Sequence, residues 1–464
     1  MTPLARHGTV LFISESMSSG LMIISGFLIA RGLSVGEFGA FTAALSLVSI
    51  FAIMADSGMG MLAARDIARG TPDALTALDR LFSWRLLVIT FLWLSVPVMG
   101  ILFLGSVEAR HLALILTPAL FLQGLVDFFC WIFKGAQRAV LCAALQISSR
   151  LLLLGGILLA LHSTQRLKEI ETAYIVVNLL ASIAGFLLIN ATLHPLRVIN
   201  LPRSFFSKTV PGIYRLGAIL ILGVAFSRID VVLVARLRGQ VDAGLYAAAN
   251  RLLDGVRLVP MMAYSVFLTI FSALHDQPEE LRPKFLVAYE VALFTGFAAA
   301  LIGSSFGRLL LTRLLGAPYA AAEPCLRALL WSAVPLCINI LIFALLYALG
   351  DQRTPLIGIA VAIGLEVILD LLWLPQGSIV SAGWIRVIAD SANGLILAVG
   401  LLRKGIVTSQ ALLLRPALLA FACIGLLWIL RDQSAFLRLL CPLSVCTAIA
   451  FLGSPQKKAV MAWD

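Results

Sequence analysis

Long apolar stretches, separated by short polar segments, follow one another along almost the whole chain of 464 residues. Most are about 20 residues or longer, the length that an α-helix needs to cross the hydrocarbon core of a bilayer. Strands of a membrane barrel would instead alternate apolar and polar residues over about ten positions. The pattern predicts an all-α polytopic membrane protein with about fourteen spans, at 9–30, 37–56, 82–105, 112–133, 139–161, 171–193, 212–236, 242–272, 286–305, 327–349, 355–374, 378–402, 412–430 and 437–453.

Composition narrows the classes of protein that remain. Hydrophobic residues make up 61% of the chain and charged residues 13%, whereas soluble domains carry about 25% charged residues. That share of polar side chains is too small to cover a soluble globule, which excludes a soluble enzyme, a nucleic-acid module, a disordered chain and a secreted disulfide scaffold. The longest connection, 57–81, is too short for a soluble catalytic domain, so we predict that the chain is not an enzyme.

We attribute the net charge of +11 to orientation in the membrane and not to binding of nucleic acid. Basic side chains of membrane proteins gather in cytoplasmic loops, where they set the orientation of the helices. One set of loops is enriched in them and includes Arg65, Arg69, Arg138, Arg353 and Lys404. We therefore predict that both termini lie in the cytoplasm and that the bilayer is a partner of the chain.

Neither cysteine nor histidine indicates a metal or another cofactor. The seven cysteines form no C-x-x-C pair and most lie in apolar runs, as small buried hydrophobic residues do. The five histidines lie at segment ends without the spacing of a metal-binding motif. We expect no cofactor.

An internal repeat predicts the architecture. Arg31 and Gly39 recur as Arg236 and Gly244, each pair 205 residues apart, and Gly135-Ala136-Gln137-Arg138 recurs as Gly350-Asp351-Gln352-Arg353. The second pair is 215 residues apart. Both offsets correspond to six helices, and an even number of helices keeps both copies in the same orientation, as in a parallel repeat. The predicted parts are a six-helix lobe at 1–193, a cytoplasmic linker at 194–211, a second six-helix lobe at 212–402, and two extra helices with a short tail at 403–464.

Two matched lobes around a midplane cavity are the frame of an alternating-access transporter. The alternative is a purely structural duplication, as in a channel or a membrane enzyme. Because both lobes belong to one chain, a monomer is the expected functional unit.

Arginines inside the predicted spans are candidates for an anion site. A charged side chain at the bilayer centre is costly unless it is paired or hydrated, and its presence there indicates function. Arginine also presents a planar fork that matches phosphate oxygens. The predicted cationic cavity consists of Arg150, Arg228, Arg251, Arg257 and Arg386.

Acidic residues in the same spans offer a second interpretation. Arg251 precedes Asp254 by three positions and Arg386 precedes Asp390 by four, spacings that put both charges on one helix face. Such pairs would neutralise each other and allow the helix to insert. The acids that either couple transport to an ion or balance charge are Asp230, Asp254, Glu366, Asp370 and Asp390.

Several of these segments resemble a known family. The link at 30–39, the Asp56-Ser57-Gly58 turn and the basic stretch at 64–69 resemble the N-terminus of the O-antigen and exopolysaccharide repeat-unit flippases. Further likeness lies in Arg228-Ile229-Asp230 ahead of 244–249, in 314–316 ahead of Tyr319, and in 381–383. This family belongs to the multidrug/oligosaccharidyl-lipid/polysaccharide exporter superfamily, and the resemblance covers about residues 1–402.

The resemblance implies two six-helix lobes that rock between inward-open and outward-open states around a cationic cavity. It implies a multi-pass protein of the bacterial inner membrane. Its substrate would be undecaprenyl-diphosphate-linked oligosaccharide, moved to the periplasmic leaflet for surface polysaccharide synthesis. Polysaccharide polymerase or ligase machinery is a further partner that it suggests. The chain has no Walker-type phosphate loop, so ATP hydrolysis is not expected.

Three alternatives stay open at this point. A peptidoglycan lipid-precursor flippase of the same superfamily would also have fourteen helices. A drug/cation antiporter would prefer an acidic, aromatic cavity, and Asp56 and Asp127 keep it in consideration. A membrane sugar polymerase or ligase would need a large outer loop, but the longest predicted one, 306–326, is short.

Overall fold

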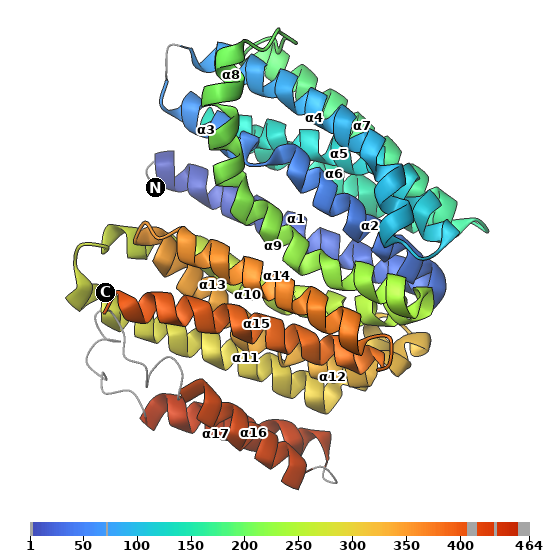
Figure 1. The fold of residues 1–464 in the computed structure, drawn as a ribbon, viewed down its shortest axis with the longest axis vertical. Coiled ribbons are helices and arrows are strands. Elements are labelled where there is room, and N and C mark those ends of the chain that lie inside the picture. Colours follow the sequence, from blue (N-terminus) through green and yellow to red (C-terminus); the bar gives the residue numbers. More distant parts are fainter. Residues whose placement is uncertain (1–2, 71–72, 406–414, 431–433, 453–464) are drawn as a thin grey trace. The chain divides into compact units, whose positions relative to one another are not determined.

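The computed structural model describes residues 3–70, 73–405, 415–430 and 434–452, and its regular elements there are all helices (Figure 1). The first half of the chain forms α1 (Pro3–Gly32), α2 (Val35–Asp56), α3 (Met59–Ala68), α4 (Ala74–Phe103), α5 (Val107–Gly135), α6 (Ala139–Ala160), α7 (Arg166–Thr192), α8 (Arg203–Lys208) and α9 (Val210–Arg238). The second half forms α10 (Gln240–Ala273), α11 (Pro278–Leu314), the 3-10 helix η1 (Ala317–Ala322), α12 (Glu323–Leu330), α13 (Ala333–Ala348), α14 (Arg353–Trp373), α15 (Ile379–Arg403), α16 (Arg415–Ile429) and α17 (Ala435–Leu452).

Helix packing divides the chain into two compact units, with the boundary between Ala247 and Ala248. In the first unit, α2 packs along α5 and α9, α5 along α7, and α1 along α6. In the second, α14 packs along α15, while α11 contacts α13 and α17. The boundary falls within α10, because α9 and the first turns of α10 pack with the first unit. The division into lobes at 1–193 and 212–402, made by counting helices, stays a prediction.

The helices have the length and composition of membrane spans. In the described part of the chain, 11 helices qualify, and η1 and α12 with α13 supply a twelfth span bent by 43°. Pro335, which has no N–H to donate, lies just after this bend. The apolar parts of α16 and α17, Pro416–Ile429 and Ala435–Ser444, are shorter. The predicted polytopic all-α class is confirmed, whereas fourteen is an approximate count.

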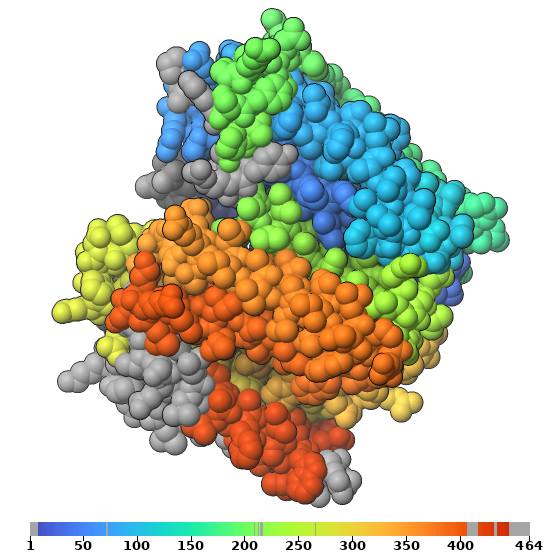
Figure 2. All heavy atoms as spheres, viewed as in Figure 1, coloured from blue at the N-terminus to red at the C-terminus, as the bar shows by residue number. Residues whose placement is uncertain are grey.

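The surface of α4 is that of a helix in contact with lipid. The helix lies on the face of the first unit that Figure 2 shows, in blue. One side of it exposes an apolar stripe made of Leu87, Phe91, Leu94, Val98 and Ile101, each more than half exposed. The opposite face is buried in the protein and carries Arg85, Val88, Leu92 and Val96. An apolar stripe of this length is suited to hydrocarbon rather than to water.

The predicted connection 57–81 is wrong as a loop, because helices occupy most of it. Ser57 and Gly58 take left-handed conformations, with φ of 44° and 82°, and end α2 at the turn that the sequence indicates. The chain then re-enters a helix, α3, whose Met59 and Leu62 are buried. α3 packs closely on α5: an added Cβ at Gly135 would lie 2.5 Å from the Ala64 carbonyl oxygen. Contact with α5 therefore stabilises a helix too short to be recognised from periodicity.

The two copies of the repeat motif contact each other where α2 and α10 begin. A Cβ built on Gly39 would lie 1.8 Å from the carbonyl oxygen of Gln240, and one built on Gly244 would lie 2.0 Å from that of Val35. Gln240 is the repeat equivalent of Val35, since the same 205 residues separate them. Equivalent atoms thus make equivalent contacts, which is the signature of a local two-fold axis. This crossing requires glycine because the helix backbones touch.

The second repeat motif places Asp351 in the turn before α14. Its carboxylate accepts hydrogen bonds from the backbone N–H groups of Arg353 (3.2 Å) and Thr354 (3.1 Å) and from the Thr354 hydroxyl (2.8 Å). Burial raises the pKa of Asp351, but the bonds from Thr354 and Arg353 and the charge of Lys404 outweigh burial and hold the pKa below its usual 3.8. The ionised carboxylate is therefore the form that stabilises the start of α14.

We expect the first turn of α14 to lose this support only in acid. A depressed pKa adds stability that is fully present above the unfolded-state pKa and is lost as pH falls through the folded one. Asp351→Ala should cost about 1 kcal/mol near neutral pH, as for other helix-start caps. Amide exchange at Thr354 in variant and wild type should differ at pH 7 and converge only at a pH below the usual Asp value of 3.8. A difference that persists unchanged in acid would contradict the assignment.

Candidate functional site

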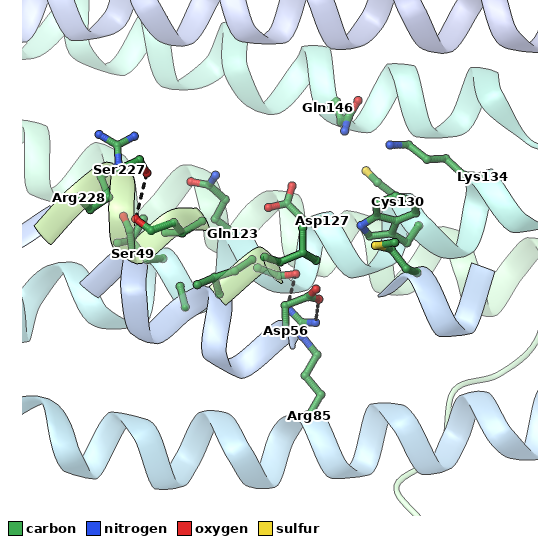
Figure 3. A pocket seen from close by; sticks show the side chains of 18 residues that line it. Ser49, Asp56, Arg85, Gln123, Asp127, Cys130, Lys134, Gln146, Ser227 and Arg228 are labelled. Carbon is green, nitrogen blue, oxygen red and sulfur yellow. Dashed lines mark hydrogen bonds and ion pairs between the residues drawn. The ribbon is translucent and has the colours of Figure 1, made fainter. Parts of the chain in front are cut away.

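A cavity of about 470 Å³ lies within the first unit, between α2, α5, α6 and α9 (Figure 3). Its charged lining side chains are Asp56, Arg85, Asp127, Lys134 and Arg228. With three basic and two acidic groups, the lining has a formal charge of +1. Ser49, Gln123, Gln146 and Ser227 add uncharged polar groups on other sides. The cavity is thus a polar space among apolar helices, with a small excess of positive charge.

Arg85 on α4 closes one side of the cavity, and both of its terminal guanidinium nitrogens are paired. Its side chain is 1% exposed and forms an ion pair with Asp56 at the end of α2. A second guanidinium nitrogen donates to the Gly124 carbonyl of α5 at 2.7 Å, and the group lies 5.1 Å from the centre of the Phe128 ring. Arg85 therefore joins three helices and has little charge left for a ligand.

Lys134 lies at the end of α5, also with a partner. Its Nζ is 2.5 Å from a carboxylate oxygen of Glu15 on α1 and 4.5 Å from the centre of the Trp131 ring. The Glu15 side chain is 54% exposed, which makes this pair much more open to competition than the Arg85 pair. Lys134 is thus able to exchange its carboxylate for another anion.

Asp127 projects into the middle of the cavity from α5 (Figure 3). Unlike Asp56, it makes no hydrogen bond or ion pair with another described side chain. Arg150 on α6 lies near enough to attract its charge, as do Arg85 and Lys134, while Asp56 repels it. The predicted site residue Arg150 therefore lies beside the cavity.

The charged residues of α9 separate into two roles. Arg228 lines the cavity, whereas Asp230 is buried and accepts a hydrogen bond of 2.7 Å from the hydroxyl of Tyr246 on α10. Two positions apart on one helix, they point in different directions. Arg228 is thus the predicted arginine that lines the cavity directly, while Asp230 connects α9 to α10.

The other predicted arginines belong to the second unit, where each contacts an acid. Arg386 on α15 bonds Asp390 at 3.0 Å and Glu366 of α14 at 3.3 Å. These three residues and Asp370 are at most 3% exposed. Arg257 lies 3.2 Å and Arg251 4.0 Å from Asp254 on α10. The i, i+3 and i, i+4 pairs expected from the sequence are present, together with the contact to Glu366 that spacing did not specify.

Sequence reasoning missed several lining residues. Arg85, Gln123, Lys134 and Gln146 line the cavity but are absent from the predicted site. A signal was available: Gln123, Asp127, Cys130 and Lys134 follow one another at spacings of four, three and four, which puts them on one helix face. A polar face within a predicted span indicates the wall of a cavity.

Solved structures define the class of fold. The chain resembles the inward-facing conformation of a multidrug resistance MATE family transporter of the MOP superfamily, with 15% identity and a TM-score of 0.69 over 86% of this chain and 98% of that one. The lipid II flippase MurJ in an inward closed conformation is 16% identical, with a TM-score of 0.69 over 96% of this chain and 99% of that one. A MOP superfamily transporter from Pyrococcus furiosus, described as having a binding pocket of reverse polarity, is 14% identical. Its TM-score is 0.58 over 88% of this chain and 96% of that one.

This multi-pass chain therefore shares its fold with MATE transporters and with the flippase MurJ, which are transporters and flippases rather than enzymes. The model of the polysaccharide biosynthesis protein family matches residues 4–275, and the chain belongs to this family. No curated protein matches it in sequence. Family and fold together support a flippase or transporter.

Proposed function

We propose that this protein moves undecaprenyl-diphosphate-linked oligosaccharide repeat units across the cytoplasmic membrane by alternating access, for the synthesis of surface polysaccharide. The observation that carries the proposal is a polar cavity of net positive lining in a member of the polysaccharide biosynthesis family. A diphosphate needs cations at membrane depth, and the cavity offers them. The hydrocarbon tail stays in lipid while the headgroup enters the protein.

Arg228 and Arg150 are the residues that we propose to contact the diphosphate in the first unit. Arg228 lines the cavity and Arg150 lies beside Asp127. Guanidinium groups bind phosphate oxygens in a bidentate manner and remain charged at any physiological pH. Arg251, Arg257 and Arg386 are candidates from the second unit, but their contacts with Asp254, Asp390 and Glu366 favour a charge-balancing role. Asp230 and Asp370 are assigned to charge balance with them.

The orientation that fits this function puts both termini in the cytoplasm, with Arg65 and Arg138 at the inner surface. A monomer suffices, because one chain carries both copies of the repeat. The expected partners are the lipid-linked substrate, the bilayer, and the polymerase or ligase that consumes the flipped unit.

Arg150→Ala and Arg228→Ala should each reduce transport at least about a hundredfold, if each loses a desolvated phosphate contact of about 3 kcal/mol. Arg138→Ala, which removes an exposed loop arginine, is the matched control and should retain activity. Restoration of surface polysaccharide in a deletion strain, with membrane levels measured in parallel, reports the outcome. Full activity of both cavity variants would remove the cationic site from the mechanism.

The function itself is tested by deleting the gene in its host and analysing surface glycans and lipid-linked intermediates. Loss of one surface polysaccharide, with its undecaprenyl-linked unit retained on the cytoplasmic side, is the expected result. Unchanged glycans would overturn the proposal.

A drug/cation antiporter is the second candidate, since the Asp127 carboxylate faces the cavity and MATE transporters share the fold. A peptidoglycan lipid-precursor flippase is the third, because the fold of MurJ is shared over 96% of the chain. New sensitivity to cationic drugs in the deletion strain would favour the antiporter. Accumulated peptidoglycan precursor would favour the third candidate.

A further inference from the structure

We propose that Asp127 is a built-in competitor of the substrate's phosphate, and that uptake of a proton by its carboxylate strengthens anion binding in the first-unit cavity. This inference rests on the proposed function, because it concerns how the same cavity accepts an anionic headgroup. It adds a residue that regulates binding to those proposed to contact the phosphate.

The other acids around the cavity are committed to partners, and Asp127 differs from them. Asp56 holds the buried guanidinium of Arg85, and Glu15 holds the ammonium group of Lys134. Asp127 faces the open space instead, with the amide of Gln123 beside it on α5 and that of Gln146 across the cavity on α6 (Figure 3). Its negative charge is therefore the one that an incoming phosphate meets in the cavity itself.

The charges that surround Asp127 come from five helices. Asp56 faces it from α2, Arg85 from α4, Lys134 from α5 itself and Arg150 from α6, while Arg228 lines the same cavity from α9 and Cys130 is a further titratable neighbour. Most of these groups are cationic. In the empty cavity the Asp127 carboxylate thus supplies the negative charge that these cations attract.

Phosphate and carboxylate compete for the same cations. Like charges a few ångströms apart repel strongly in a cavity shielded from bulk water. With Asp127 ionised, the lining has a formal charge of +1, and with Asp127 protonated the charge is +2. Anion affinity should therefore increase as pH falls through the titration of Asp127, and removal of its charge should produce the same gain at any pH.

The test uses the purified full-length protein in lipid nanodiscs and inorganic pyrophosphate as the probe. Calorimetry measures its affinity, and the fluorescence of Trp131, which lines the cavity, provides a second readout. Asp127→Asn keeps the size of the side chain and removes its charge. Asp276→Asn, at a surface turn where the aspartate is 85% exposed, is the matched control.

At pH 7.5, Asp127→Asn should bind pyrophosphate at least about tenfold more tightly than wild type and the Asp276→Asn control. The gain should shrink as the pH is lowered and wild-type Asp127 takes up a proton. The ratio between variant and wild type at each pH cancels the titration of the probe. Asp127→Ser also removes the charge and is tested in the same way, so the inference can still be tested if Asp127→Asn does not fold.

Equal affinities of wild type and both Asp127 variants at every pH would overturn this inference. The proposed function would survive that result if gene deletion still removes a surface polysaccharide. No pyrophosphate binding by any of the proteins would overturn the anion site, and with it this inference. Tighter binding of an organic cation than of pyrophosphate, lost in Asp127→Asn, would instead make Asp127 the cation ligand of an antiporter.

Discussion

Gly39→Leu is expected to prevent assembly of the first unit. Even the first side-chain carbon would lie 1.8 Å from the Gln240 carbonyl oxygen and 2.7 Å from the Gly244 nitrogen. These are backbone atoms of another helix, so relief requires α2 and α10 to separate. Overpacking of this kind costs about 3 kcal/mol or more, a large part of the 5–15 kcal/mol that stabilises a typical domain. Thermal unfolding in detergent, followed by size-exclusion chromatography, measures the loss.

The repeat provides an equivalent variant, and a neighbouring glycine on α2 provides the control. Gly244→Leu should be as damaging as Gly39→Leu, since its Cβ would lie 2.0 Å from the Val35 carbonyl oxygen. Gly36→Ala is the control, because its Cβ would make an ordinary contact of 3.8 Å with Val241. A Gly39→Leu protein as stable as Gly36→Ala would show that the helices do not cross at these glycines.

The second large effect is expected at the ion pair beneath the cavity. Asp56→Asn leaves the Arg85 guanidinium, 1% exposed, without its carboxylate. Removing one partner of a buried pair costs about 3–5 kcal/mol, because the remaining charge is uncompensated. We expect Asp56→Asn and Arg85→Met each to lower the unfolding midpoint strongly, while the double variant recovers part of the loss. A double-mutant cycle in detergent isolates this coupling.

An exposed ion pair provides a reference for the coupling energy measured in that cycle. Arg327 and Glu323 are four positions apart on α12, and the arginine side chain is 49% exposed. Surface pairs of this kind contribute about 1 kcal/mol or less, so Glu323→Gln should have a small effect. A coupling at Asp56–Arg85 no larger than at this surface pair would show that water reaches the guanidinium and that the cavity floor is open.

Predictions from the sequence succeeded where a long pattern determines structure. The span predicted at 37–56 is α2 at Val35–Asp56, and that at 242–272 is α10 at Gln240–Ala273. A segment of about 20 apolar residues forms a helix in a bilayer, because a single segment satisfies its own backbone hydrogen bonds only as a helix. α3 was missed because ten residues carry less than three turns of signal, and contact with α5 stabilises them instead.

Prediction of the site was less complete because cavity lining depends on helix rotation. Position within a predicted span can be counted from the sequence, and it identified Arg150 and Arg228 together with Arg251, Arg257 and Arg386. Depth does not indicate which side of a helix faces the cavity, nor that Glu15 of α1 lies against Lys134 of α5. The match of Glu366 with Arg386 likewise depends on how α14 packs on α15.

The sequence by itself determined that this protein is a polytopic helical membrane protein with an internal repeat, since hydrophobic length and recurrence are properties of the chain alone. The tertiary structure decided which charges are neutralised and which face the cavity. The physical reason is that an ion pair depends on distances of a few ångströms between helices far apart in sequence. Arg85 and Asp127 are both charged residues within apolar helices, yet packing buries the first against Asp56 and leaves the second facing the cavity.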